Sequence, residues 1–436
     1  MKKLIQSLSA LLAIFSALMS GLLFIKNRAP HGFALWFPKM FAGALSPISA
    51  LAGAVGGILG MVSGAPLSAL FGGWGAYAAW GYLKKTFAQR AGLERAFGRD
   101  WAGRISAERQ SGLLQERWDW TFPAEHQPRW HPDRVFWTLE NGRKLLCNLW
   151  LPAAEVKSSG LAVLYFHGSA WTILDKDFLT RPIFRHLAAQ GHVVMDVAYR
   201  LAPETDMAGM VADVKRALVW MKTHAAEYRV DPDKIVLMGS SAGGQLSLLA
   251  AYAPDHPLMT PPELAGADLS VRAVVSVYGP IDLTACYFHT NQDKAPRTPA
   301  LVTPEPDPER ERFMHRLMGD RYERWGFNKD GAAGSFYNLL GGHPDQIPEK
   351  YTLYSPVSYV HPGCPPTFLA QGEDDLMVPP TATRLMADRL AEAGVPVVNL
   401  IFPHTDHGFE LALPTFNPAA RVMLYELDRF LALMGN

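Results

Sequence analysis

The stretch KIVLMGSSAGGQLSLLAAYA, residues 234–253, decides how the rest of the chain is interpreted. Its first apolar run is typical of a buried strand, and its second apolar run is typical of a helix. Between the two lies the pattern G-x-S-x-G, with Ser241 at its centre. A sharp turn from strand to helix strains the central residue and exposes its hydroxyl above a sheet. The pattern therefore predicts that Ser241, rather than Ser240, is a nucleophile.

The sequence around this stretch alternates between strand and helix patterns. Two runs, 134–140 and 144–152, flank Asn141-Gly142, which is a strong hairpin signal. Further strands are expected at 161–168, 192–199, 271–279, 365–372 and 396–402. Helices are expected at 181–191, 210–228, 381–394 and 419–434. This alternation predicts an α/β fold with a mostly parallel central sheet that is flanked by helices.

Two loops late in the chain offer the partners that a serine nucleophile needs. A serine hydroxyl reacts poorly unless a base takes its proton. In this kind of fold the acid follows the serine and the histidine comes last. The segment HTDHGFE offers His404 and His407 as bases. The segment QGEDDLMVPP offers Glu373, Asp374 and Asp375 as acids.

A third loop is expected to stabilise the oxyanion that forms when a serine attacks a carbonyl. Such an anion needs backbone N–H donors aimed at it. Ala242, directly after the nucleophile, supplies one, and the segment YFHGSAW supplies others at Gly168 and Ser169. We expect His167 to hold this loop by hydrogen bonds rather than to act as a base.

Four segments together resemble the α/β-hydrolase fold and, within it, the hormone-sensitive-lipase-like esterases: HGSAW, YRLAPE (199–204), GSSAGG and HGF (407–409). The resemblance covers residues 133–434. It implies a catalytic triad of Ser241, Asp375 and His407. Asp375 matches the pattern G-x-x-D-x-x-V-P, and His407 matches H-G-F.

The chain departs from the family pattern at two positions. Ser169 stands at the second glycine of the oxyanion motif, whereas Trp171 is kept, which is similar to the HGGxW branch of small-ester hydrolases, formamidases and membrane-bound prenylcysteine methylesterases. If Ser169 must adopt a positive φ, the strain costs about 1 kcal/mol or more and activity is lower. Ser240 replaces the aspartate that usually precedes the nucleophile, but this position is not one of the reacting groups.

Residues 1–83 are expected to anchor the chain to a membrane. No charged residue occurs among the 22 positions of 4–25, and a helix of that length crosses the roughly 30 Å hydrocarbon core of a bilayer. A second uncharged run, 40–83, is broken near Ser63-Gly64-Ala65-Pro66 and is expected to form a hairpin that crosses the membrane or dips into it. A cleaved signal peptide is the alternative for the first helix. Flanking positive charges favour a cytoplasmic catalytic domain, although Lys2 and Lys3 oppose this orientation.

The remaining boundaries follow from composition. Residues 84–133 are charged and rich in tryptophan, and they are expected to form amphipathic linker or cap helices at the membrane surface or over the next domain. Residues 134–436 are expected to form the catalytic domain. A cap insertion at about 283–355, with a helix near 306–325, is expected to close over the active site, unless this insertion is disordered.

Charge and cysteine content exclude several classes of function. Lys plus Arg and Asp plus Glu each number 41, so no basic excess favours a nucleic-acid partner. Three cysteines at unrelated spacings indicate neither a zinc site nor a disulfide scaffold. Triad hydrolysis needs no metal or organic cofactor.

The sequence thus predicts a membrane-attached serine hydrolase that cleaves small or lipid-like carboxylic esters through an acyl-enzyme. An amidase or formamidase with the same triad, and a non-catalytic membrane scaffold with this fold, are the alternatives. The sequence sets neither acyl specificity nor oligomeric state.

Overall fold

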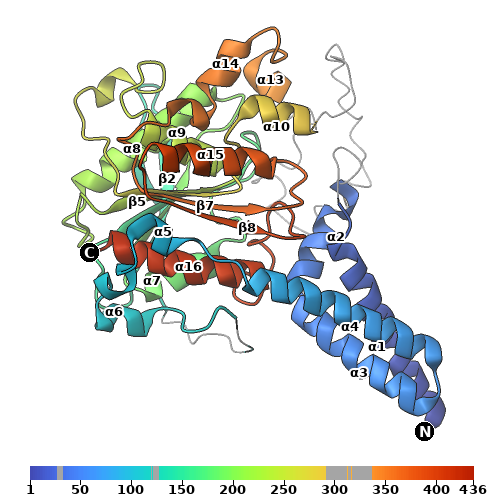
Figure 1. The fold of residues 1–436 in the computed structure, drawn as a ribbon. Helices are drawn as coiled ribbons and strands as arrows, with labels where there is room; N and C mark the ends of the chain where they lie inside the picture. The colour runs from blue at the N-terminus through green and yellow to red at the C-terminus, as the bar shows by residue number, and fades with distance from the viewer. Residues whose placement is uncertain (27–32, 119, 121–126, 291–311, 313–315, 317–335) are drawn as a thin grey trace.

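One eight-stranded sheet organises the chain after residue 128 in the computed structural model (Figure 1), which describes residues 1–26, 33–118, 120, 127–290, 312, 316 and 336–436. Its spatial order is β1-β2-β4-β3-β5-β6-β7-β8. β2 pairs antiparallel with both β1 and β4, whereas β3 to β8 are parallel to one another. The strands are β1 (Arg129–Thr138), β2 (Lys144–Leu151), β3 (Ala162–Phe166), β4 (Val193–Ala198), β5 (Ile235–Ser240), β6 (Ala273–Val277), β7 (Thr367–Gly372) and β8 (Val397–Phe402). The predicted α/β class with a mostly parallel sheet is confirmed.

Helices cover both faces of the sheet because successive side chains of each buried strand point to opposite faces. Leu237 of β5 packs in one core with α8 (Met207–Thr223), α9 (Ala242–Tyr252) and α15 (Pro380–Glu392). Its neighbour Val236 packs in the other core with α7 (Arg181–Ala189) and α16 (Pro418–Met434). Figure 1 shows the two helical layers above and below the strands. Both faces of the central strands are therefore buried, as their continuous apolar runs predict.

The sheet begins at Arg129, earlier than the predicted catalytic boundary at residue 134. The pairing register of β1 with β2 shifts between His131 and Arg134. At this shift Asp133 has a φ of 49°, and its backbone N–H donates to Oδ1 of Asn148 at 3.0 Å. The bulge makes the start of β1 difficult to predict from the sequence, because it interrupts the alternation of side chains between the two faces.

Short helices connect the N-terminal region to the sheet and pack against the catalytic domain. They are α5 (Leu93–Phe97), η1 (Trp101–Arg104) and α6 (Ala107–Gly112). The N–H of Asn399, in β8, donates to the carbonyl of Ala91 at 3.0 Å, and Nη2 of Arg109 donates to the carbonyl of Ser159 at 2.8 Å. This segment thus lies along the face of the sheet that α16 covers (Figure 1).

The region of the predicted cap is described at its two ends and at positions 312 and 316. α10 (Leu283–Thr290) begins it, and α13 (Phe336–Leu340) and α14 (Pro348–Leu353) lie near its end. The helix predicted near 306–325 lies outside the described residues, apart from positions 312 and 316. Two further 3₁₀ turns are η2 (Pro262–Leu264) and η3 (Pro356–Tyr359).

Three long helices form a bundle that projects from the catalytic domain (Figure 1): α1 (Lys2–Leu23), α3 (Ser46–Ser63) and α4 (Pro66–Phe87). Gly64 ends α3 in a left-handed conformation with φ 72°. A fourth helix, α2 (Phe33–Ala44), lies between the bundle and the catalytic domain and has no counterpart in the predicted elements. By length and composition, α1 and α3 are each apolar enough to cross a membrane.

Small and polar side chains line the interior of this bundle, whereas large apolar side chains cover its surface. Hydroxyls of α1 cross to neighbouring helices, since Oγ of Ser9 donates to the carbonyl of Gly56 at 2.8 Å and Oγ of Ser20 donates to the carbonyl of Gly75 at 2.9 Å. The exposed side chains on the three helices include Leu4, Leu8, Leu11, Ile14, Leu18, Leu51, Ile58, Met61, Val62, Leu67, Leu70, Trp74, Tyr77 and Trp80. This distribution is the reverse of that in a water-soluble bundle.

Two adjacent glycines of α4 test this packing. A Cβ added at Gly72 would lie 2.5 Å from the backbone nitrogen of Gly57, whereas a Cβ at Gly73 would meet nothing within 4 Å. We expect Gly72→Val to destabilise the detergent-solubilised chain by about 1–3 kcal/mol, because α3 and α4 must separate. Thermal unfolding checks this, with Gly73→Val as the matched control that changes the melting temperature little. Equal effects of the two substitutions would contradict the helix packing described here.

Candidate active site

Ser241 sits at the sharp turn between β5 and α9. Its backbone has φ 51° and ψ −124°, a strained conformation for a residue with a side chain. Close packing around the turn requires glycine at the neighbouring positions. A Cβ at Gly239 would collide with the backbone of Gly243, and a Cβ at Gly168 would lie 3.2 Å from Cβ of Ser241. The turn thus presents the half-buried hydroxyl of Ser241 at the carboxyl edge of the parallel strands.

The structure brings Ser241, His407 and Asp375 together in one chain of hydrogen bonds. Nε2 of His407 lies 3.0 Å from Oγ of Ser241, and Nδ1 of His407 lies 2.8 Å from Oδ2 of Asp375. His407 and Asp375 are both buried, with 5% and 2% of their surfaces exposed. His404 lies outside this chain of hydrogen bonds. It contacts the Nζ of Lys85 at 3.3 Å instead.

The carboxylate of Asp375 is held on all sides by donors. Its Oδ1 accepts the N–H groups of Met377 and Val378, both at 2.8 Å, and its Oδ2 also accepts Nε2 of Gln371 at 2.7 Å. Sequence reasoning missed Gln371, although its place just before the acidic loop, at the end of β7, was a usable signal. These donors fix the position of the carboxylate from which it can orient an imidazole.

The electrostatics of His407 suit a base that gains a proton during reaction. Burial alone lowers the pKa of the imidazole, but the charge and hydrogen bond of Asp375, together with the charges of Glu410 and Asp406, outweigh burial, so that the net pKa of His407 is raised. The ring of Tyr278 packs on the imidazole with 4.3 Å between centroids and fixes its plane. The positive form of His407 is therefore stabilised next to Ser241.

The loop that follows β3 places Gly168 beside the nucleophile, and Ser169 follows it in this loop. Oγ of Ser169 lies 2.7 Å from the Tyr199 hydroxyl and accepts the N–H of Trp171 at 2.9 Å. Positive φ angles fall on Ala170 and Trp171, at 44° and 63°, and not on Ser169. The strain considered for Ser169 is therefore absent, and its side chain braces the loop. Ala242 begins α9, where the first N–H groups have no acceptor within the helix.

The side chains of His167 and Trp171 contact the groups around this loop. The His167 ring stacks on Tyr199 at 4.6 Å, and its Nδ1 lies 3.2 Å from the carbonyl oxygen of Gly168. Burial lowers the pKa of His167, which favours a neutral ring in a structural role. Nε1 of Trp171 donates to Oε1 of Gln245 at 2.8 Å. Both side chains thus contact groups of this loop or of the helix after the nucleophile, and their supporting role stays a prediction.

A buried carboxylate under the site was missed by sequence reasoning. Glu410 is 1% exposed, and its Oε1 accepts hydrogen bonds from Ser240, at 2.8 Å, and from Tyr278. Tyr165 in turn donates to Oγ of Ser240 at 2.9 Å. Ser240 itself is uncharged, but it thus pairs with a carboxylate, that of Glu410, which comes from the loop after β8. The signal in the sequence was its place directly after the H-G-F motif.

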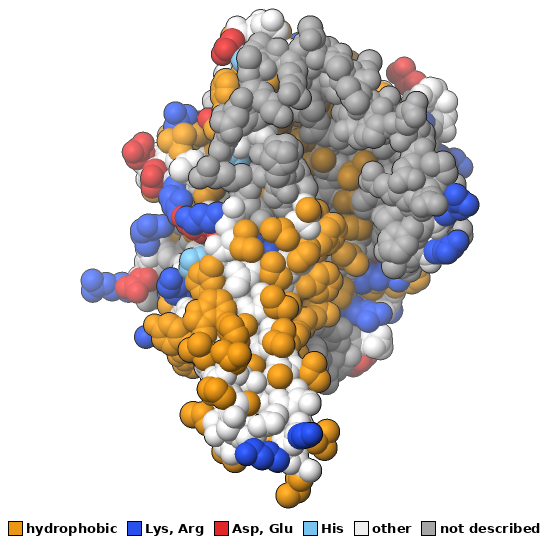
Figure 2. All heavy atoms as spheres, turned by 90° about the vertical axis from the view of Figure 1, so that its right-hand side faces the viewer, with side chains coloured by type: hydrophobic (Ala, Val, Ile, Leu, Met, Phe, Trp, Pro, Cys, Tyr) orange, Lys and Arg blue, Asp and Glu red, His pale blue; other side chains and the backbone are white. Residues whose placement is uncertain are grey.

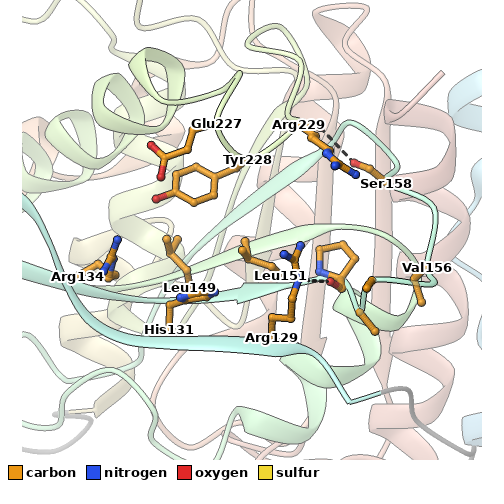
Figure 3. A pocket seen from close by; sticks show the side chains of 13 residues that line it. Arg129, His131, Arg134, Leu149, Leu151, Val156, Ser158, Glu227, Tyr228 and Arg229 are labelled. Atoms are coloured by element: carbon orange, nitrogen blue, oxygen red, sulfur yellow. Dashed lines mark hydrogen bonds between the residues drawn. The ribbon is translucent and has the colours of Figure 1, made fainter.

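Two further questions about the described residues are whether they form a metal site and whether they enclose another cavity. No group of three or more His, Cys, Asp or Glu side chains gathers among them as a metal site would require. A separate cavity of about 400 Å³ lies at β1 and β2, with Arg129, His131, Arg134 and Arg229 in its lining (Figure 3). Its lining includes none of the candidate catalytic residues.

Comparison with known proteins gives consistent matches. Residues 147–390 match the family model described as BD-FAE. The probable carboxylic ester hydrolase LipM of Mycobacterium tuberculosis is 31% identical over 274 residues, which cover 62% of this chain and 55% of LipM. Esterase LipQ of the same organism is 28% identical over 338 residues, which cover 74% of this chain and 69% of LipQ. The chain thus spans just over half the length of LipM.

A solved structure agrees with the fold. Native esterase 2 of Thermogutta terrifontis superposes with a TM-score of 0.50 at 25% sequence identity, covering 71% of this chain and 92% of that chain. Together with the strand order and the serine turn, the match to more than half of the residues decides the family. The chain belongs to the BD-FAE family, an α/β-hydrolase family, and its relatives include named esterases of the hormone-sensitive-lipase-like type.

Proposed function

We propose that the chain is a membrane-attached serine hydrolase that cleaves carboxylic esters. The observation that carries this proposal is the continuous hydrogen bonding from Ser241 through His407 to Asp375. A hydroxyl, an imidazole and a carboxylate in this order are the parts that nucleophilic acyl transfer needs. The names of LipM and LipQ, a probable carboxylic ester hydrolase and an esterase, favour ester rather than amide substrates.

The proposed reaction has two halves. Oγ of Ser241 attacks the ester carbonyl while His407 takes its proton, and the new C–O bond gives a tetrahedral oxyanion. The N–H groups of Gly168, Ser169 and Ala242 are the proposed donors to this oxyanion. When the old C–O bond breaks, His407 gives the proton to the departing alcohol. Water then attacks the acyl-enzyme in the same way, releasing the acid and restoring Ser241.

Membrane attachment is proposed from the surface of the bundle. Figure 2 shows apolar side chains over the bundle helices, with Lys or Arg side chains near its free end. Large exposed apolar surfaces mark contact with a membrane or a partner. Here the buried glycines and serines of the interior favour lipid as the contact, because small residues let helices approach closely without a hydrophobic driving force. A signal sequence remains the alternative for α1, but α1 also supplies part of this packed interior.

The charges at the two ends of the bundle support a cytoplasmic catalytic domain. Lys26, Lys84, Lys85 and Arg90 lie at the catalytic end, whereas Lys2 and Lys3 lie at the free end. Lys39 does not add to this bias, because its charge is buried against two carboxylates. An excess of Lys and Arg marks the cytoplasmic side of short loops.

The function is tested with the full chain in detergent and in membranes. We expect hydrolysis of p-nitrophenyl esters graded from acetyl to long-chain acyl, loss of that activity after reaction with a fluorophosphonate, and retention of the chain in membranes after an alkaline carbonate wash. Matching anilides and formamides test the amidase alternative. Preferential cleavage of the amides would replace the ester proposal, and absence of any fluorophosphonate adduct would favour a non-catalytic scaffold.

Glu410→Gln is expected to change the pH dependence of the reaction. The carboxylate of Glu410 raises the pKa of His407, because a negative charge favours the imidazolium. Its removal lowers that pKa, so His407 stays neutral, and able to act as a base, to lower pH. The acid limb of kcat/KM should therefore move to lower pH. Glu426→Gln is the control, because it removes a buried carboxylate that pairs with Arg117 instead. An unmoved acid limb would show that Glu410 carries no charge in this range.

A further inference from the structure

Helix α2 of the N-terminal region lies against both loops that carry Asp375 and His407. Nζ of Lys39 is 3.2 Å from Oδ2 of Asp374 and 3.8 Å from Oδ2 of Asp406, and it donates to the carbonyl of Ile25 at 2.7 Å. Lys39 is 2% exposed. Because Asp374 precedes Asp375 and Asp406 precedes His407, one buried ammonium joins the acid loop to the histidine loop.

The carboxylate of Asp406 connects Lys39 to the backbone of the two loops that carry Asp375 and His407. Its Oδ1 accepts the N–H of His407 at 2.8 Å and the N–H of Leu376 at 3.0 Å. Asp406 is thus bound to the backbone on both sides of the His407–Asp375 hydrogen bond. Two buried carboxylates beside Asp375 would repel it and each other without a positive partner, and removing one partner of a buried ion pair leaves a costly uncompensated charge.

Trp36, one helical turn before Lys39, makes the second contact. Its Nε1 donates to the carbonyl oxygen of His407 at 2.6 Å, and its ring centroid is 6.5 Å from that of the imidazole. A Cβ at Gly408 would lie 3.3 Å from Cζ2 of Trp36, so the indole also packs against the next residue of the loop. α2 therefore contacts the histidine loop both through a hydrogen bond and through van der Waals packing.

The long helices of the bundle meet the same loop. The hydroxyl of Tyr82 in α4 lies 3.3 Å from Oγ1 of Thr405, and the ring of Phe24, after α1, packs on His404 with 4.6 Å between centroids. We infer that the N-terminal helices are part of the active site as well as an anchor, with Lys39 and Trp36 acting as positioning residues for His407 and Asp375. This inference rests on the proposed function.

The test compares kcat and KM of full-length variants in the same detergent. Lys39→Met should lower kcat for p-nitrophenyl butyrate about tenfold or more and leave KM within about twofold, because Lys39 contacts the two catalytic loops but is too buried to contact a substrate. Lys39→Arg, which keeps the charge, should recover most of the lost kcat. Trp36→Phe, which keeps an aromatic ring but removes the N–H donor to His407, should lower kcat several-fold. Lys84→Met, an exposed lysine of the same bundle, is the matched control and should resemble the wild type.

Two outcomes would overturn the inference: wild-type kcat in Lys39→Met, or an equal loss in Lys84→Met. If Lys39→Met does not fold, as shown by its melting curve, Trp36→Phe decides, and wild-type kcat in that variant overturns the inference. Failure of the proposed function looks different, because it would appear as a wild-type chain without esterase activity or without a fluorophosphonate adduct at Ser241.

Discussion

Ser241→Ala should lower ester hydrolysis by about 10⁴-fold or more, because the proposed acyl-enzyme forms on the hydroxyl that this substitution removes. The hydroxyl of Ser241 is the only described hydroxyl within hydrogen-bonding distance of Nε2 of His407, at 3.0 Å. Residual rate above that of water would come from the oxyanion donors and from binding alone. The measurement is kcat/KM of the full chain with a p-nitrophenyl ester, together with fluorophosphonate labelling.

Ser240→Ala is the matched control for this variant. Ser240 is the preceding serine, but its hydroxyl donates to Oε1 of the buried Glu410, whereas the hydroxyl of Ser241 is the one that meets His407. We expect Ser240→Ala to keep fluorophosphonate labelling even if its rate falls through the loss of that buried hydrogen bond. Substantial activity in Ser241→Ala, or loss of labelling only in Ser240→Ala, would show that the wrong serine has been assigned.

Asp375→Asn should lower kcat by about 10³- to 10⁴-fold while the substrate still binds. The carboxylate oxygen at 2.8 Å from Nδ1 of His407 keeps the proton on that nitrogen and leaves Nε2 free to accept the proton of Ser241. An amide can instead donate to Nδ1 and select the wrong tautomer. Because the charge of Asp375 also raises the pKa of His407, the acid limb of the residual activity should move to lower pH.

Glu373→Gln is the control on the same loop. Glu373 is two residues before Asp375, but its side chain is solvent-exposed and pairs with Arg384. A surface ion pair contributes little to stability, so this variant should retain wild-type kcat and melting temperature. If Asp375→Asn kept most of its activity, another acid would have to orient His407, and the assignment of Asp375 would fail.

The sequence carried enough information for the sheet and for the three residues that meet at Ser241. Strands such as β5 and β7 are buried along their whole length, and the continuous apolar run of β5 ends at Gly239. Because the carboxyl ends of parallel strands lie at one edge of a sheet, the loops after them must converge, and the order of motifs then places Asp375 and His407 near Ser241. Local sequence patterns are therefore sufficient to predict a site whose residues the fold brings together at one edge of the sheet.

The parts that could not be predicted depend on contacts between distant segments. Nothing near Lys39 in the sequence indicates that its charge is buried against Asp374, 335 positions later. In the sequence it stands out only as an isolated charge in an apolar region. Glu410 was hidden in the same way, because its partners Ser240 and Tyr278 come from two other strand ends. The bulge at Asp133 concealed the start of β1 by interrupting its pattern.

The backbone at Ser241 limits which nucleophiles this position can hold. At φ 51° a β-branched side chain would clash with its own backbone, so a threonine is excluded although it also carries a hydroxyl. Cysteine, which is unbranched at Cβ, fits the same turn. Any evolutionary exchange of the attacking atom here would therefore run from oxygen to sulfur, and would leave the turn and its glycines unchanged.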